Sequence, residues 1–138
     1  MHITIQNLIK IKNEIKFNLK DLETANLPKI IAVSKTFKID KILPLIDYGH
    51  IDFGENKIQE AIDKWTDIRS KNSNIKLHMI GKLQSNKVKF AVKLFDYIHS
   101  VDSEKLAKKI ADEQEKIKKK VKIFIQVNIG NEYQKSGI

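Results

Sequence analysis

The sequence has no cysteine, two prolines and, among its 26 basic residues, a single arginine at position 69. Without cysteine there is no disulfide, no thiolate nucleophile and no cysteine-ligated metal site, and nothing points to an oxidising compartment. No apolar run approaches the roughly 20 residues of a membrane helix, and the N-terminal residues mix Ile and Leu with Lys, Asn and Glu, unlike a signal peptide. We therefore expect a cytoplasmic protein that does not bind a membrane.

The scarcity of arginine also bears on the net charge of +9, which by itself suggests nucleic-acid binding. Proteins that recognise bases and phosphates favour arginine, because its planar fork binds them bidentately. The many Ile, Lys and Asn residues are what an AT-rich coding sequence produces, without any selection for a binding partner. We therefore disfavour a nucleic-acid partner. The rival hypothesis of a basic nucleic-acid binder predicts an affinity that falls steeply with salt.

Length and pattern predict one α/β domain. The 138 residues are one domain's worth, and 41% hydrophobic content supports a buried core. We expect an N-terminal helical region at 1–28 and βα units at 29–138. The apolar spacing predicts helices at about 5–22, 39–46, 56–70, 88–94 and 104–117, and strands at about 30–34, 51–53, 76–80, 97–99 and 121–127. Five strands joined by helices predict a parallel sheet, either doubly wound or part of a barrel.

Local signals refine several of these elements. Asp40 is a candidate N-cap for the second helix, and Pro44 would then lie early in that helix, where proline costs less. Asp102 or Ser103 is a candidate cap for the last helix. The run at 30–34 is continuously apolar, as expected of a strand that is covered on both faces.

In parallel α/β proteins, functional residues gather just past the carboxyl ends of the strands. Lys35 follows the first strand directly, so we expect its ammonium group to be partly desolvated. Desolvation lowers the pKa of a lysine and frees its neutral amine to attack an aldehyde, as in a Schiff base. The alternative is a lysine whose stem packs at a strand end while its ammonium reaches water. Position alone does not separate the two.

Other catalytic motifs are missing. The segment 49–54 has the glycine spacing of a phosphate loop, but Glu55 and Asn56 stand where Lys and Ser or Thr are required. The four histidines lack metal-ligand spacing, and no serine lies in a GxSxG elbow.

Six short motifs, in order and with characteristic spacing, carry a family resemblance. They are AVSKT (32–36), DFGEN (52–56), HMIGKLQSNK (78–87), HSVDS (99–103), QVN (126–128) and KSG (135–137). In these motifs the chain resembles the pyridoxal phosphate homeostasis family, whose fold is similar to the N-terminal barrel of alanine racemase. Lys82 departs from the pattern, since the family often has histidine there.

The resemblance implies that pyridoxal 5′-phosphate (PLP) is held as a Schiff base on Lys35, with Asn56 beside the cofactor and His78 near the rim with the segment 81–87. It implies an incomplete TIM-barrel-like (β/α) fold of the alanine racemase N-terminal type with about five parallel strands, since a closed barrel needs about 200 residues or more. The phosphate grip of the family lies in the part beyond this chain. We also expect an apolar edge at the fifth strand.

From the resemblance we expect a PLP-binding protein of intracellular PLP homeostasis without catalytic turnover. PLP-dependent apoenzymes and a separate chain supplying the C-terminal half are its candidate partners. One alternative is a PLP-dependent racemase-like enzyme, which needs a second acid–base group that we do not find in the sequence. The other is a truncated, non-functional remnant.

Overall fold

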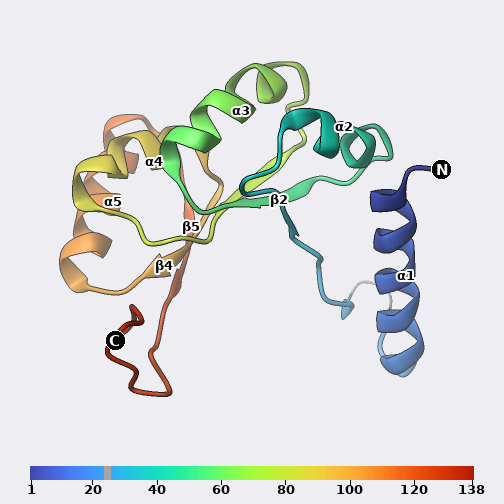
Figure 1. Ribbon diagram of the computed structural model, residues 1–138. Coiled ribbons are helices and arrows are strands. Elements are labelled where there is room, and N and C mark those ends of the chain that lie inside the picture. Colours follow the sequence, from blue (N-terminus) through green and yellow to red (C-terminus); the bar gives the residue numbers. More distant parts are fainter. Residues whose placement is uncertain (24–25) are drawn as a thin grey trace.

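The computed structural model describes residues 1–23 and 26–138, which form five parallel strands and their connecting helices (Figure 1). The sheet has the strand order β1-β2-β3-β4-β5, so each strand pairs with its neighbour in the sequence. The strands are β1 (Ala32–Val33), β2 (Asp52–Glu55), β3 (Lys76–Met79), β4 (Tyr97–Val101) and β5 (Lys122–Ile125). The helices are α1 (Ile3–Asn18), α2 (Ile39–Asp47), α3 (Ile58–Lys71), α4 (Val88–Leu94), preceded by the short 3-10 helix η2 (Ser85–Lys87), and α5 (Glu104–Lys116).

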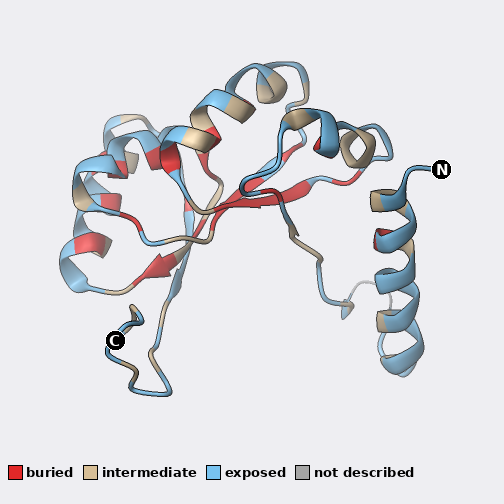
Figure 2. Cartoon of the chain, viewed as in Figure 1, coloured by how far each residue is buried: buried red, intermediate tan, exposed pale blue. Residues whose placement is uncertain are grey.

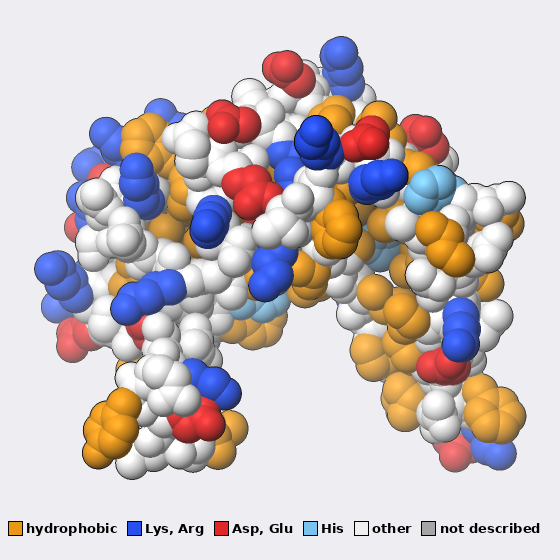
Figure 3. All heavy atoms as spheres, viewed as in Figure 1, with side chains coloured by type: hydrophobic (Ala, Val, Ile, Leu, Met, Phe, Trp, Pro, Cys, Tyr) orange, Lys and Arg blue, Asp and Glu red, His pale blue; other side chains and the backbone are white. Residues whose placement is uncertain are grey.

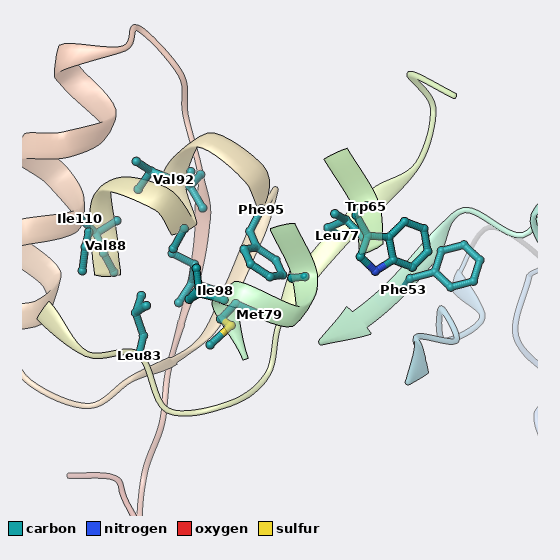
Figure 4. Packing of buried hydrophobic residues seen from close by; sticks show 14 of the residues in the cluster. Phe53, Trp65, Leu77, Met79, Leu83, Val88, Val92, Phe95, Ile98 and Ile110 are labelled. Atoms are coloured by element: carbon teal, nitrogen blue, oxygen red, sulfur yellow. The ribbon is translucent and has the colours of Figure 1, made fainter. Parts of the chain in front are cut away.

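Helices α2 to α5 lie together along one face of the sheet, and the core fills the layer between them (Figures 1 and 4). Every second strand residue enters this layer, because side chains alternate between the two faces of a strand. The largest side chains buried there are Trp65 on α3, Phe53 on β2 and Phe95 after α4. The ring centroids of Phe53 and Trp65 are 4.9 Å apart. The opposite face, which we call the inner face, has no helical layer, and Figure 3 shows a hollow beneath it between α1 and the C-terminal tail.

The predicted order of elements is confirmed, and the predicted boundaries of α4 agree with the structure. Ser103 is the N-cap of α5, since its side chain accepts a hydrogen bond from the Leu106 N–H. The prediction for α2 is wrong in detail. Lys38 occupies its N-cap, so Asp40 lies in the first turn, and Pro44 is inside the helix. The first helix also ends at Asn18, earlier than its apolar spacing predicts.

The expectation that the first strand is covered on both faces is wrong. Val33 is 48% exposed on the inner face of β1. At the other end of the sheet all four residues of β5 are exposed (Figure 2), and Ile125 is 64% exposed. The predicted apolar edge is therefore present. Within residues 1–23 and 26–138, none of the helices has the length and apolar character that crossing a bilayer requires.

Candidate functional site

The two faces of β2 carry different chemistry. Phe53 and Glu55 face the helices, because Phe53 packs on Trp65 and the Trp65 Nε1–H donates to Glu55 Oε1 at 2.9 Å. Asp52 and Gly54 alternate with them and face the inner side. A Cβ at Gly54 would lie 3.1 Å from the Ile31 side chain and 3.3 Å from that of Ile80. The inner face is thus closely packed beside this glycine, and the residues that follow the strand form its rim.

Lys35 and Asn56 follow neighbouring strands on this inner face. In the register of the sheet, Val33 of β1 pairs with Gly54 of β2. Lys35 follows Val33 by two residues, and Asn56 follows Gly54 by two residues. The Ser34 N–H donates to the Gly54 carbonyl at 2.9 Å, which continues the pairing toward the rim. Neighbouring strands lie about 4.8 Å apart. The structure therefore brings these two predicted residues to adjacent strand ends.

Asn56 is in contact with the loop after β3. A Cβ added at Gly81 would lie 2.2 Å from the Asn56 carbonyl oxygen and 2.7 Å from its Cα, so only glycine permits this approach. The side-chain oxygen Oδ1 of Asn56 is buried, and among the described residues it has no hydrogen-bond partner. A buried acceptor without a partner at the rim is a position that a ligand donor can fill.

Lys35 itself is exposed in a four-residue turn that runs from Ser34 to Phe37. The Phe37 N–H closes this turn by donating to the Ser34 carbonyl at 3.2 Å. The expectation of a partly buried Lys35 is therefore wrong in this structure. Because the first strand has no covering layer on its inner face, the lysine stem begins at an open surface and not at the edge of the core.

A buried ionic network lies directly behind this turn, on the helix side of the sheet. Glu55 is fully buried, and its Oε1 is 2.8 Å from Lys64 Nζ and accepts a hydrogen bond from Ser34 Oγ at 2.8 Å. Lys64 also pairs with Glu60 at 3.1 Å, one turn earlier on α3. The motif DFGEN gave no sign of this network. The i,i+4 spacing of Glu60 and Lys64 was the one available signal.

His78 lies one step below the rim, because it pairs in register with Gly54. Its Nε2 is 2.8 Å from Asp52 Oδ1, and its Nδ1 is 2.8 Å from His99 Nε2. The His78 ring stacks on Tyr97 with a centroid distance of 4.3 Å. Both nitrogens of His78 are thus engaged in the protein. The structure places it beneath Asn56 and Lys35 and not at the level of these residues.

The pKa values of two histidines on or near this face are lowered. Burial is the larger cause that lowers the pKa of His99 below 6.5, and the neighbouring His78 adds to it. Burial likewise lowers the pKa of His50, although its bond to the Asp52 carbonyl opposes the shift. Among the described residues no group of three or more His, Cys, Asp and Glu side chains is arranged to hold a metal ion.

A second hollow, of about 510 Å³, opens past the ends of β3 and β5. It is lined by the tail after β5, which folds back without a helix or strand. Gln126 Nε2 donates to the Ser136 carbonyl at 2.9 Å, and the Ile138 N–H donates to the Gln126 carbonyl at 3.0 Å. Lys82 and Lys135 bring positive charge to this hollow.

Comparison with known proteins gives consistent matches. The family model described as "Alanine racemase, N-terminal domain" matches residues 12–138. The chain is 43% identical over 136 residues to the pyridoxal phosphate homeostasis protein of Buchnera aphidicola subsp. Schizaphis graminum, covering 96% of this chain and 58% of that protein. It is 35% identical over 134 residues to the protein of the same name from Pasteurella multocida, again covering 96% of this chain and 58% of the relative.

A solved structure agrees in fold. PipY of Synechococcus elongatus with PLP bound is 36% identical and superposes with a TM-score of 0.72, covering 89% of this chain and 57% of PipY. The structure of PipY without PLP gives a TM-score of 0.76. The chain thus spans somewhat more than half the length of these relatives.

Proposed function

Because this chain belongs to the alanine racemase N-terminal domain family, with five parallel strands of that type of βα barrel, we propose that it binds pyridoxal 5′-phosphate and acts in intracellular homeostasis of this cofactor. The observation that carries the proposal is the position of Lys35 and Asn56, each two residues past the paired Val33 and Gly54 on adjacent strands. The similarity to PLP-bound PipY, which covers the same part of the fold, supports it.

Lys35 is the residue that we assign to covalent attachment. Lys35 would hold the cofactor through the amine of its exposed side chain, and the cofactor would supply the aldehyde to which such an amine can bond. Asn56 would offer its buried amide oxygen, which has no partner among the described residues, to a donor on the bound group. His78 supports this arrangement from below, since its nitrogens are bonded to Asp52 and His99.

We further propose that the chain binds PLP without catalytic turnover. A racemase-like enzyme needs a second acid–base group facing the cofactor. Both nitrogens of His78, the histidine predicted near the rim, are bonded to neighbouring side chains, and this supports a structural role for it. We propose PLP-dependent apoenzymes as recipients of the cofactor, a cytoplasmic location, and a single domain for residues 1–138.

The test is titration of the purified chain with PLP, followed by borohydride reduction and mass mapping of the modified peptides. We expect labelling confined to Lys35, lost in Lys35→Ala and retained in Lys38→Ala, a control at an exposed lysine three residues away. Scattered labelling over surface lysines, or unchanged labelling in Lys35→Ala, contradicts the proposal. Racemisation of an amino acid by the same preparation, lost in Lys35→Ala, would favour the enzyme instead.

The labelling experiment requires a folded chain, and this requirement separates the proposal from the remnant hypothesis. A chain with the core described here should unfold cooperatively in urea. A gradual loss of signal without a transition would favour the remnant, and labelling would then carry no information about the site.

A further inference from the structure

The turn that carries Lys35 has an unfavourable backbone conformation. Thr36 has a φ of 66°, in the left-handed region that favours glycine. A β-branched side chain in this region is a steric outlier, and such residues persist only where surrounding contacts hold them in place. The chain therefore needs contacts from outside the turn to keep Lys35 in the orientation observed.

Those contacts come from one face of α3. The Thr36 N–H donates to Glu60 Oε1, and Lys64 Nζ donates to the Ser34 carbonyl at 2.7 Å. Glu60 and Lys64 are themselves paired at 3.1 Å across one helical turn. A single ion pair thus binds the backbone on both sides of Lys35, while the Lys35 side chain stays exposed and takes no part.

The ion pair is anchored in the core. The Lys64 side chain is 7% exposed, and it lies 2.8 Å from the fully buried Glu55, which also accepts hydrogen bonds from Ser34 and Trp65. Moving Lys64 would leave a buried carboxylate without its cation, which is strongly unfavourable. Burial opposes ionisation of Glu60, but the hydrogen bonds from Lys64 and from the Thr36 N–H outweigh it and lower the pKa of Glu60. Glu60 is therefore charged at neutral pH.

We propose that Glu60 and Lys64 are positioning residues for Lys35. They fix the Ser34–Phe37 turn so that the Lys35 amine leaves the backbone in one orientation on the inner face, beside Asn56. This inference rests on the proposed function of Lys35. The effect that we propose is preorganisation. A lysine on a free loop would sample many orientations, whereas the fixed backbone on both sides of Lys35 limits the directions from which its amine would approach an aldehyde.

The first experiment concerns the ligand-free chain. Amide hydrogen exchange at Thr36 should be about tenfold faster in Glu60→Ala, because a charge-assisted hydrogen bond is lost. In Glu60→Gln it should remain close to that of the unmodified chain, since glutamine keeps an oxygen that can accept from the same N–H. Glu104→Ala, which removes the exposed partner of Lys108, is the matched control. Unchanged Thr36 exchange in Glu60→Ala overturns the inference.

The second experiment measures the rate at which PLP labels Lys35, by quenching with borohydride at successive times. Glu60→Ala should slow labelling about tenfold, Glu60→Gln should restore it, and the affinity for PLP measured in a Lys35→Ala background should change little. If exchange at Thr36 rises but labelling keeps its rate, the positioning role is refuted and the proposed function stands.

The two proposals fail separately. If the unmodified chain is not labelled at Lys35, the proposed function fails, while the exchange experiment still decides whether the ion pair fixes the turn. Should Glu60→Ala not fold, Glu60→Asp keeps the charge opposite Lys64 but draws the carboxylate away from the Thr36 N–H. Normal Thr36 exchange in that variant would also overturn the inference.

Discussion

Asp52 Oδ1 lies 2.8 Å from His78 Nε2 on the inner face of the sheet, and the other nitrogen of His78 contacts His99. The three side chains come from β2, β3 and β4, so a continuous line of polar contacts crosses three neighbouring strands. The His99 ring also stacks on Phe124 of β5 with a centroid distance of 4.6 Å. This layer lies on the inner face directly beneath the rim that carries Asn56.

His99 of this layer and the nearby His50 make stability depend on pH below about 6.5. The pKa of His99 and that of His50 are both lowered below 6.5 in the folded chain, chiefly by burial. Between that value and the lower folded pKa, the unfolded chain binds more protons than the folded chain, so the free energy of unfolding falls as the pH falls through this window. Urea unfolding at pH 7.5 and 5.5 should show a lower midpoint at pH 5.5.

Variants identify the groups responsible for this pH effect. His99→Gln and His50→Gln should each reduce the difference between the two pH values. His2→Gln, at the exposed N-cap of α1, should leave it unchanged. A midpoint that stays constant or rises on acidification would show that these histidines do not control stability in this range.

Lys64→Ala tests the buried ionic network through stability alone. It leaves the fully buried Glu55 carboxylate without its cation, so we expect the free energy of unfolding to fall by about 3–5 kcal/mol. Lys108→Ala removes a side chain that is 73% exposed from a surface ion pair, and its unfolding midpoint should hardly move. Equal unfolding midpoints for the two variants in urea would mean that Glu55 finds another partner or becomes protonated.

Much of the fold could be predicted from the sequence, because alternating apolar spacings and turn residues encode the order of its elements. The apolar run at 30–34 predicted burial on both faces that β1 does not have, whereas the apolar edge expected at the fifth strand is present in β5. The apolar pattern of a strand indicates which of its side chains can be buried. Only the three-dimensional arrangement shows which face of the strand is covered by other elements. For the same reason the partial burial expected of Lys35 is absent.

The site was predictable only in part. The position after a strand singled out Lys35, and the family resemblance added Asn56 and His78. The partners of Glu55 were beyond sequence reasoning, because Ser34 and Lys64 meet it across 21 and 9 residues through tertiary packing. The N-cap of α2 shows a related limit: Asp40 has the better capping side chain, yet the chain enters the helix at Lys38.

Gly81→Ala should disrupt the rim. The added Cβ would lie 2.2 Å from the Asn56 carbonyl oxygen, and the backbone of one loop must move to relieve this contact. We expect a loss of about 1–3 kcal/mol in unfolding free energy, together with weaker labelling of Lys35 by PLP. Gly130→Ala is the control, since its nearest neighbour would be the Glu132 side chain at 3.5 Å. Equal behaviour of the two variants would contradict the close approach of the loops.

The exposed strand β5 should make the chain associate with itself. Ile123, Phe124 and Ile125 are 43%, 52% and 64% exposed on an edge strand, and apolar edge strands pair readily with other chains. Sedimentation velocity should show a weight-average mass above 16.0 kDa that rises with concentration.

Ile125→Lys places a charge on the most exposed of the three residues and should restore a monomer with little loss of stability, because that side chain contributes little to the core. Thr66→Lys on the exposed face of α3 adds the same charge elsewhere and should not. If both variants reduce association equally, general charge repulsion governs it, and the edge strand is not its cause.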